Sequence, residues 1–284
     1  MVYTFFDPLS ANGRGFELLD RFKIDYSYDY EEIEYVNILT ESFDNASNMI
    51  VPTDIIFIIG GDQTVNSVIN KYLSLNLSCE VFLYAPEDAN DFLVDIDGEP
   101  YKLINITKYL KNLPYTIIDQ EKIYFLNNVG YGLDGRVCAI AQEKEKTHAN
   151  YNYKSIAAKL ILIYKKKRAT VIVDDKEYSY KNIFLLSTFN SRYYGNHMMA
   201  APTQDRLSSS LTIMVMRSKT HIGAISIFKS IIKGEHLKYK DKIEVLTGNH
   251  IIVRFETPEY IQVDGKVIGE VYEYEAFKEK ETLE

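Results

Sequence analysis

Apolar residues in the first third of the chain alternate between two spacings, one typical of buried strands and one typical of helices. Residues 55–59 form an apolar run rich in isoleucine, as expected for a strand covered on both faces. The apolar residues of 65–73 recur three or four positions apart, which indicates a helix with one buried face. Strands alternating with helices predict a mostly parallel sheet between two helical layers. The full pattern predicts strands at 2–6, 33–39, 55–59 and 80–84, and helices around 16–22, 44–50, 65–73 and 103–113.

The pattern changes near Pro114, where strand signals become more frequent. Most of these strands follow one another without a helix between them, which predicts an antiparallel, sandwich-like domain. The predicted fold is therefore α/β, with a Rossmann-like three-layer domain at 1–114 that binds a nucleotide and a strand-rich, β-sandwich-like domain at 115–284. In an alternative domain organisation, the last residues of the chain pack against the first domain. Strands are predicted at 115–119, 123–128, 169–174, 178–189, 211–216, 242–246, 251–255 and 260–263, with helices at 137–164, broken near 147–150, and at 221–233.

Composition narrows the class of protein without naming an activity. The net charge of −8 speaks against nucleic acid or an anionic membrane as a general partner. Cys79 and Cys138 lie far apart in apolar surroundings, which predicts buried free thiols in a reducing compartment. The chain start lacks the basic and apolar regions of a signal peptide, and no apolar run is long enough to span a membrane. These features predict a cytoplasmic protein, and a homodimer stays open.

The turn Gly60-Gly61-Asp62 joins the central predicted strand to its helix and is the first candidate for chemistry. Backbone N–H groups of such a turn attract phosphate, and an aspartate there suits Mg²⁺. Ligands of parallel sheets lie beyond the carboxyl ends of the strands, so the loops after the first four strands should share one rim. The alternative is an ordinary strand–helix turn with a chance Gly-Gly-Asp, because short glycine motifs often match by accident.

Further segments in order along the chain strengthen the first interpretation. Residues 7–11, 60–67 and 90–92 resemble the motifs N-P-x-S-G, G-G-D-G-T-x-N-E and N-D-F, and 130–135 and 263–266 resemble G-x-G-x-D-A and the late D-G-E. This set resembles the catalytic domain of the diacylglycerol kinase family, which includes bacterial lipid kinases and sphingosine kinases. The resemblance covers nearly the whole chain.

The resemblance implies transfer of the γ-phosphoryl group of ATP to the hydroxyl of a lipid such as diacylglycerol, with Mg²⁺. The resemblance also leaves open that the protein contacts a membrane peripherally. Asp62 and Asp264 stand at catalytic positions, Lys266 stands at the family's base position, and Asp62 and Asp205 stand where a metal would be held. The nucleotide positions are Asp7, Ser10, Asn12, Gly13, Thr40, Gly60, Gly61, Asp62, Gln63, Thr64, Asn66, Asp88 and Asn90.

The chain departs from the family at chemical positions. Gln63 replaces a glycine, which would cost about 1–2 kcal/mol if that glycine's left-handed backbone is kept. Asp88 stands in place of the threonine of a Gly-Thr pair and would repel phosphate unless a metal intervenes. Lys266 replaces a glutamate, and a lysine acts as a base only when burial removes its charge. Asp264 could replace it as base or form an ion pair with it on one extended strand, and we favour the ion pair.

Two other charged features have structural interpretations that we favour. Asp134 lies in a glycine-rich turn, where an Asx turn is expected more often than a catalytic role. Residues 165–168, three lysines and an arginine, follow a predicted helix. A solvated helix end explains them, and contact with lipid headgroups is the alternative.

Three functions follow. The first is an active lipid kinase. The second is a catalytically impaired relative that binds nucleotide or lipid, or regulates, and the altered Gln63, Asp88 and Lys266 favour it. The third, which we rank below both, is an enzyme similar to NAD kinase, which shares the Gly-Gly-Asp turn. A fold resemblance alone does not choose among them.

Overall fold

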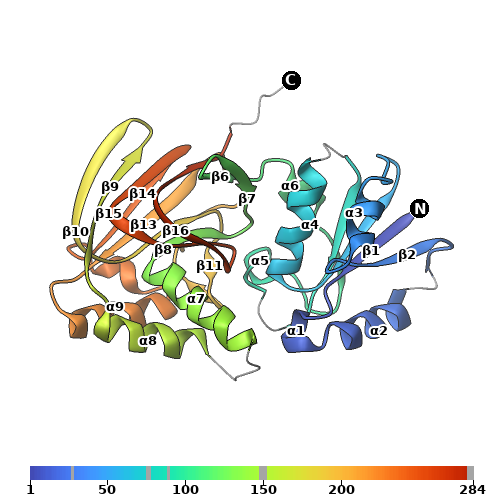
Figure 1. The fold of residues 1–284 in the computed structure, drawn as a ribbon, viewed down its shortest axis with the longest axis horizontal. Coiled ribbons are helices and arrows are strands. Elements are labelled where there is room, and N and C mark those ends of the chain that lie inside the picture. Colours follow the sequence, from blue (N-terminus) through green and yellow to red (C-terminus); the bar gives the residue numbers. More distant parts are fainter. Residues whose placement is uncertain (27–28, 75–77, 88–89, 147–151, 280–284) are drawn as a thin grey trace. The chain divides into compact units, whose positions relative to one another are not determined.

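The computed structural model describes residues 1–26, 29–74, 78–87, 90–146 and 152–279. The chain divides into two compact units, Met1–Lys111 and Asn112–Glu284 (Figure 1). Each has its own sheet, which reflects the change in sequence pattern near Pro114. Within the described residues, no helix has the length and apolar character needed to cross a membrane.

The first unit is built on a five-stranded sheet in the order β2–β1–β3–β4–β5. The first four strands pair in parallel, and β5 pairs antiparallel to β4 at the edge. The mostly parallel sheet that the sequence predicts is confirmed. The strands are β1 (Val2–Phe6), β2 (Ile33–Asn37), β3 (Ile55–Ile59), β4 (Glu80–Tyr84) and β5 (Leu103–Asn105), and the helices are α1 (Ser10–Gly13), α2 (Gly15–Tyr26), α3 (Glu41–Ser47), α4 (Asp62–Ser74), α5 (Asp91–Asp95) and α6 (Thr107–Leu110).

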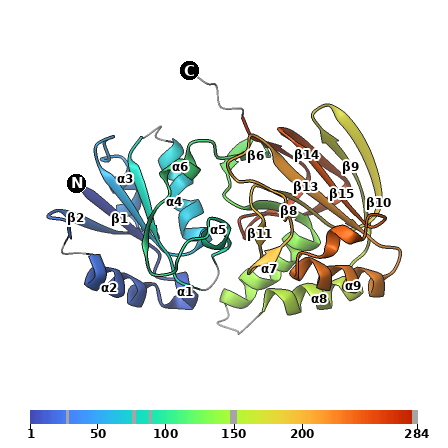
Figure 2. The same ribbon diagram turned by 180° about the vertical axis from the view of Figure 1, so that it is seen from behind.

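Helices cover both faces of this sheet because successive strand residues point to opposite sides. On one face, Phe22 of α2 packs edge-on against Phe57 of β3, with ring centroids 5.6 Å apart. On the other face, Phe43 of α3 packs edge-on against Phe5 of β1 at 5.3 Å. The predicted three-layer arrangement is therefore confirmed (Figures 1 and 2).

The predicted helix at 103–113 is wrong. The segment begins as strand β5 and turns into the short helix α6. Asn105 Oδ1 accepts the Thr107 N–H at 3.0 Å, and Thr107 Oγ1 accepts the Val81 N–H at 2.9 Å, which fastens the turn to β4. Apolar spacing over a few residues does not distinguish a strand from a helix. The helix predicted at 44–50 also begins earlier, at Glu41.

The second unit is built on a nine-stranded antiparallel sheet in the order β14–β13–β10–β8–β15–β16–β6–β7. The ninth strand, β9, pairs with both β10 and β15, so β10, β8, β15 and β9 form a closed ring of pairings. The predicted β-sandwich-like, largely antiparallel unit is confirmed. Its strands are β6 (Tyr115–Ile118), β7 (Glu121–Tyr124), β8 (Asn128–Gly132), β9 (Lys167–Val173), β10 (Lys176–Phe189), β11 (Tyr193–Tyr194), β12 (Met198–Met199), β13 (Leu211–Arg217), β14 (Ile243–Gly248), β15 (His250–Val263) and β16 (Lys266–Phe277).

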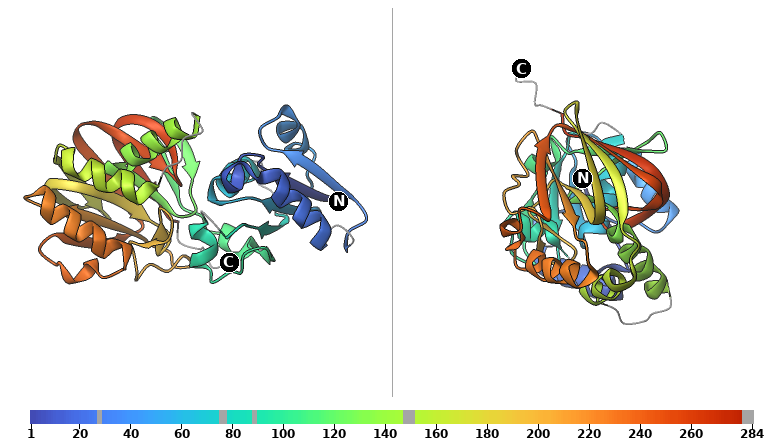
Figure 3. Two further views of the ribbon diagram at one scale, coloured as in Figure 1. Left: turned by 90° about the horizontal axis from the view of Figure 1, so that it is seen from below. Right: turned by 90° about the vertical axis from the view of Figure 1, so that its left-hand side faces the viewer.

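Two apolar cores stabilise this unit, one on each side of the sheet. One core gathers mainly strand side chains, among them the fully buried Tyr131 and Tyr274. The other gathers the opposite strand faces with three helices, which lie together on one side of the sheet (Figures 1 and 3). These are α7 (Leu133–Lys146), α8 (Tyr153–Ile163) and α9 (His221–Ile232), followed by the 3₁₀ turn η2 (His236–Lys238).

Several predicted boundaries in this unit change. The strands predicted at 251–255 and 260–263 form one long strand, β15, whose pairing with β16 shifts register between Arg254 and Glu259. Strand β16 was not predicted, and the strand predicted at 123–128 is divided between β7 and β8. The predicted helix break near 147–150 lies outside the described residues.

Candidate functional site

The carboxyl ends of the four parallel strands meet at one edge of the first unit's sheet. Phe6 at the end of β1 is in register with Asn37 of β2 and Ile59 of β3, and Ile59 is in register with Tyr84 of β4. The loops that carry most of the predicted nucleotide residues therefore leave the sheet along the same edge, which we call the rim. This placement follows from the parallel pairing alone.

Asp7 and Thr64 connect the loops after β1 and β3. The Asp7 carboxylate accepts the Leu9 N–H at 2.8 Å and lies 3.5 Å from the Thr64 hydroxyl. Gly60 has φ 155°, and a Cβ there would lie 2.3 Å from Thr64 Oγ1. A glycine at this position therefore allows Thr64 to pack over the turn and point its hydroxyl toward Asp7.

Asp62 connects the loops after β3 and β4. Its carboxylate accepts the N–H groups of Asp91 at 2.8 Å and Phe92 at 3.2 Å, and the residue is half-buried. The neighbouring Asn90 caps α5, because its Oδ1 accepts the Leu93 N–H at 2.8 Å. The Asp62 carboxylate thus orders the rim, and its charge lies at the position where the sequence predicts metal and phosphate.

Two hydrogen-bond donors in the rim loops are buried and have no partner within the described part of the chain. They are the Ser10 hydroxyl and the Asn90 Nδ2 amide. A buried donor without an acceptor is costly, about 1–3 kcal/mol. A phosphate or ribose oxygen would satisfy such donors, so this observation fits a nucleotide at the rim.

The other predicted nucleotide residues differ in how they are placed. Asn12 adopts left-handed φ 59° in α1, just before Gly13 at φ 83°. Thr40 is exposed, and its hydroxyl donates to Asn37 O at 2.9 Å. Asn66 is buried and accepts the Asn70 amide at 3.3 Å through Oδ1. Gly61 leads into α4, since its carbonyl accepts the Val65 N–H at 3.1 Å, and Asp88 lies outside the described residues.

The backbone strain predicted at Gln63 does not occur. Gln63 lies in the first turn of helix α4, and its side chain is exposed. The prediction assumed that the family's glycine needs a left-handed backbone. In this chain, the helix begins at Asp62, so a residue with a side chain fits without cost.

In the second unit, Asp264 lies in a tight turn instead of an extended strand. Asp264 and Gly265 have φ 46° and 86° between β15 and β16, as in a two-residue hairpin turn. The buried Asp264 carboxylate accepts the N–H groups of Leu126, Asn127 and Asn128 at 2.6, 2.8 and 3.0 Å. The carboxylate therefore holds the start of β8 against this hairpin.

Lys266 is exposed at the first position of β16. Among the described residues it forms no ion pair with Asp264, so the predicted ion pair is wrong. The turn separates the two side chains, whereas the prediction required an extended strand. The burial that would let a lysine act as a base is also absent at this position.

Asp134 has a buried environment that the sequence did not reveal. Its Oδ2 accepts from the side chains of Gln262 at 2.9 Å, Ser187 at 3.3 Å and Asn128 at 3.4 Å. The predicted Asx turn is wrong, because these donors belong to three strands. Burial raises the pKa of Asp134 to about 6, although the three hydrogen bonds oppose this shift. A Cβ at Gly130 would lie 1.6 Å from this Oδ2, so the glycine makes the space.

The predicted metal ligand Asp205 does not fit a structural Mg²⁺ site. Asp205 is exposed, and its carboxylate accepts the Leu207 N–H at 2.9 Å. No cluster of three or more histidine, cysteine or acidic side chains suited to a metal occurs in the described ranges. Two buried cations occupy this region. The Arg206 guanidinium donates to Leu126 O and to Asn127 Oδ1 at 2.7 Å.

The second cation is Lys278, which is 2% exposed and follows β16. Its ammonium donates to Asn190 Oδ1 at 2.6 Å and to Arg206 O at 2.7 Å. A protein ammonium thus binds the carbonyl of Arg206, the residue next to Asp205, where the resemblance implies a metal. Sequence reasoning missed Lys278, because nothing near it in the chain indicates burial.

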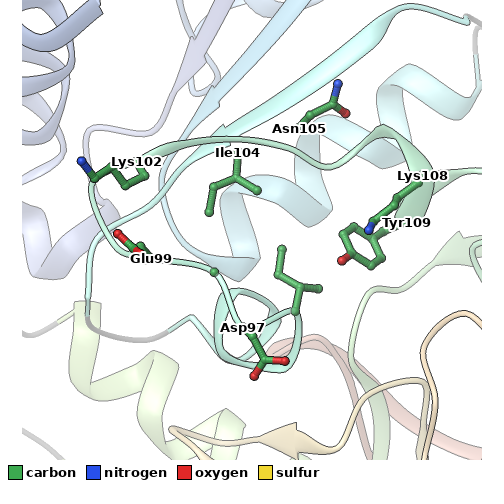
Figure 4. A pocket seen from close by; sticks show the side chains of 9 residues that line it. Asp97, Glu99, Lys102, Ile104, Asn105, Lys108 and Tyr109 are labelled. Atoms are coloured by element: carbon green, nitrogen blue, oxygen red, sulfur yellow. The ribbon is translucent and has the colours of Figure 1, made fainter.

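A hollow of about 420 Å³ lies beside α5 and α6, away from the predicted residues. Figure 4 shows Glu99 and Lys102 on one side of it and Lys108 and Tyr109 on the other. Acidic and basic groups both line it, so its charge selects neither anions nor cations. None of the predicted nucleotide residues lines this hollow.

Residues 127–276, more than half of the chain, match the family described as the YegS C-terminal NAD kinase beta sandwich-like domain. The chain belongs to this diacylglycerol kinase-like lipid kinase family. The match spans β8, the Asp134 environment and the Asp264 hairpin, so the family resemblance carried by these motifs is confirmed.

Individual relatives of the lipid kinase family agree with this result. The Staphylococcus haemolyticus protein "Putative lipid kinase SH2167" is 24% identical over 75% of this chain and 70% of its own length. A Staphylococcus carnosus protein named "Putative lipid kinase" is 23% identical over 77% of this chain and 72% of its own. A Bacillus anthracis "putative diacylglycerol kinase" structure has a TM-score of 0.71 at 19% identity, covering 98% of this chain and 92% of that chain, which supports the fold.

Proposed function

We propose that the protein binds ATP at the rim of its first unit and transfers the γ-phosphoryl group to the hydroxyl of a lipid such as diacylglycerol. The convergence at the rim carries this proposal. Asp62 and Asp7 connect three of the four rim loops, and the same loops hold the unpartnered Ser10 hydroxyl and Asn90 amide. Membership of a lipid kinase family supports a lipid acceptor.

The rim residues also suit Mg²⁺ that arrives with the nucleotide. Mg²⁺ is commonly held by one or two carboxylates together with phosphate oxygens. Asp62 would hold it, and the ion would supply neutralisation of charge on the phosphates. The chain's own contribution is positional, because Asp62 fixes the β4 loop through two backbone N–H groups.

A second candidate function is a catalytically impaired relative that binds nucleotide or lipid, or regulates a partner. Two observations favour it. Lys266 is exposed at the family's base position, and the Asp264 carboxylate is occupied by three backbone N–H groups. Phosphoryl transfer to a hydroxyl needs a group that accepts the hydroxyl proton.

Thermal unfolding with and without Mg-ATP tests nucleotide binding. ATP at about 100 times its dissociation constant should add about 2.7 kcal/mol to the free energy of unfolding. Asp62→Asn should reduce this gain, because it removes the charge opposite the ion. No stabilisation of the wild-type protein by Mg-ATP, together with no labelled phosphate on diacylglycerol, would refute the kinase proposal.

Replacement of Lys266 separates the active from the impaired protein. If the protein is impaired, Lys266→Glu should raise transfer of labelled phosphate to lipid above the wild-type level. Lys176→Glu is the matched control, because Lys176 is also exposed and also follows a two-residue turn of positive φ, at the start of β10. Transfer by the wild-type protein that Lys266→Glu does not increase would contradict impairment.

A further inference from the structure

Three large apolar side chains are exposed where α8 ends and α9 begins. Leu162, Ile163 and Ile222 are 55%, 75% and 81% exposed. The two helix ends are joined, because a His221 ring nitrogen lies 3.2 Å from Tyr164 O. We call Leu162, Ile163 and Ile222 the α8–α9 tip. Clustered exposed apolar residues on a folded protein commonly mark an interaction site.

Basic residues surround this tip. Lys165, Lys166 and Lys219 are exposed, and the Lys166 ammonium donates to Lys219 O at 2.9 Å, which keeps the two segments together. Residues 165–168 line a hollow of about 270 Å³ with Glu256 and Thr257. The whole chain carries a net charge of −8, so a basic cluster here is opposite in sign to the rest of the protein.

The fold does not need all of this positive charge. Lys167 is the cation used internally, since its ammonium lies 3.2 Å from the buried carboxylate of Glu259. Arg168 lies 3.9 Å from Glu256 at the surface. The ammonium groups of Lys165 and Lys219 are exposed, and the structure gives neither of them an acidic partner among the described residues.

We propose that the α8–α9 tip docks on the surface of an anionic lipid bilayer. The three apolar side chains enter the boundary between headgroups and acyl chains, and the lysines face lipid phosphates. This pairing of an inserted apolar face with basic flanks is the chemistry of interfacial binding. Each lysine near an anionic surface contributes about fivefold to the binding constant. This docking proposal rests on the proposed lipid kinase function in one respect, because a lipid substrate lies in a bilayer.

Vesicle sedimentation without ATP or diacylglycerol tests the docking. The wild-type protein should bind vesicles of equal parts phosphatidylcholine and phosphatidylglycerol, and bind vesicles of phosphatidylcholine alone much more weakly. Lys165→Gln with Lys219→Gln should weaken binding about twentyfold. Leu162→Gln, Ile163→Gln and Ile222→Gln together should weaken it at least tenfold. All five side chains are exposed, so the melting temperatures should stay close to that of the wild type.

Matched controls come from exposed positions elsewhere. Ile24, 74% exposed on α2, and Lys240, exposed after η2, should each tolerate a change to glutamine without loss of vesicle binding. Equal binding to neutral vesicles, or tip variants that bind as the wild type does, would overturn the proposal. Light scattering tests the alternative that the tip forms a contact between two copies of the chain. If the tip variants convert a dimer to a monomer, the tip joins two copies and the bilayer proposal is wrong.

Failure of docking and failure of the kinase proposal give different results. A short-chain diacylglycerol that is soluble as a monomer needs no bilayer. Phosphorylation of that substrate without vesicle binding would reject the docking surface alone. Vesicle binding without any phosphoryl transfer would keep the docking surface and reject the active kinase.

Discussion

Asp62 and Asp264 use the same chemistry in two different settings. Each follows a strand of its unit, and each carboxylate accepts backbone N–H groups of a neighbouring loop. Among the described residues, the half-buried Asp62 accepts two such groups, whereas the buried Asp264 accepts three. Accessible Asp62 can accept a further partner such as a metal ion. Enclosed Asp264 is committed to holding the hairpin and β8 together.

The surroundings of the two aspartates also differ in exposure to solvent. Thr40 and Gln63 on the rim of the first unit are exposed. The second unit encloses Asp134 and Lys278 within its core and satisfies them with side-chain and backbone groups. Acidic motif residues thus order a ligand-accessible edge in one unit and an interior network in the other.

Removing each of the two carboxylates should produce the largest difference in the free energy of unfolding. Asp264→Ala leaves three backbone N–H groups without their acceptor, at about 1–3 kcal/mol each, so we expect a loss of about 4–6 kcal/mol in the free energy of unfolding. Asp62→Ala removes a half-buried carboxylate, which water can replace at the Asp91 and Phe92 N–H groups, and should cost about 1–2 kcal/mol. Urea unfolding of both variants measures the difference, and equal losses would contradict the assignment.

Lys266 begins β16 and Lys278 follows it, so replacing each lysine compares an exposed cation with a buried one by the same urea unfolding. Lys278→Met removes an ammonium from Asn190 Oδ1 and Arg206 O, both of which stay buried. We expect a loss of about 3–4 kcal/mol. Lys266→Met changes an exposed side chain and should cost less than about 0.5 kcal/mol.

Treatment with EDTA tests whether a metal, in addition to Lys278, stabilises the region around Arg206. Because a lysine ammonium occupies the region around Arg206, EDTA should leave the melting temperature of the wild-type protein unchanged. A clear decrease with EDTA, reversed by Mg²⁺, would show that this region holds a metal after all.

Asp134 makes a pH-dependent contribution to stability. Its pKa is raised from 3.8 to about 6 in the folded protein, so the folded state binds the proton more tightly than the unfolded state. The resulting stability is fully present below about pH 4 and is lost as the pH rises through about 6. From pH 4 to 7, the loss should amount to roughly 2.4 kcal/mol.

Asp134→Asn tests this contribution, because an amide oxygen can still accept the three hydrogen bonds. The difference in free energy of unfolding between the variant and the wild type should change by that amount over the same pH range. Asp205→Asn, at an exposed carboxylate, serves as the control. Parallel pH profiles for wild type and Asp134→Asn would contradict the raised pKa.

Much of the fold could be predicted from the sequence because its strands and helices have clear local signals. The isoleucine-rich run of β3 and the helical spacing of α4 identify a buried strand and its crossover helix. The signals fail at β5 and β16. Strand β5 has only three residues, and β16 contains Gly269 and several glutamates that weaken its apolar pattern. Asp264-Gly265 was an available hairpin signal, since Asp-Gly favours a two-residue turn.

The candidate site could be predicted only as far as topology determines it. Parallel pairing brings the predicted rim loops to one edge, so Asp7 meets Thr64, and Asp62 meets the loop after β4. The state of each side chain depends on contacts far along the chain. Asp264 meets Leu126, and Lys278 meets Asn190, across separations that no local pattern reports.

The smallest expected effect concerns the unpartnered donors of the rim. Ser10→Ala should raise the free energy of unfolding of the ligand-free protein by about 1 kcal/mol, because it removes a buried hydroxyl that has no protein acceptor in the described part of the chain. The same substitution should weaken ATP binding about threefold to tenfold if a nucleotide oxygen accepts this hydroxyl. Isothermal calorimetry with Mg-ATP measures the second effect.

Thr4→Val is the matched control for Ser10→Ala. The Thr4 hydroxyl is also buried without a partner among the described residues, but it lies inside β1 instead of in a rim loop. Its removal should leave ATP affinity unchanged and keep the shape of the strand. Equal affinity losses in both variants would mean that ATP senses the stability of the first unit and not a specific contact. An affinity loss confined to Ser10→Ala would place the nucleotide against the loop after β1.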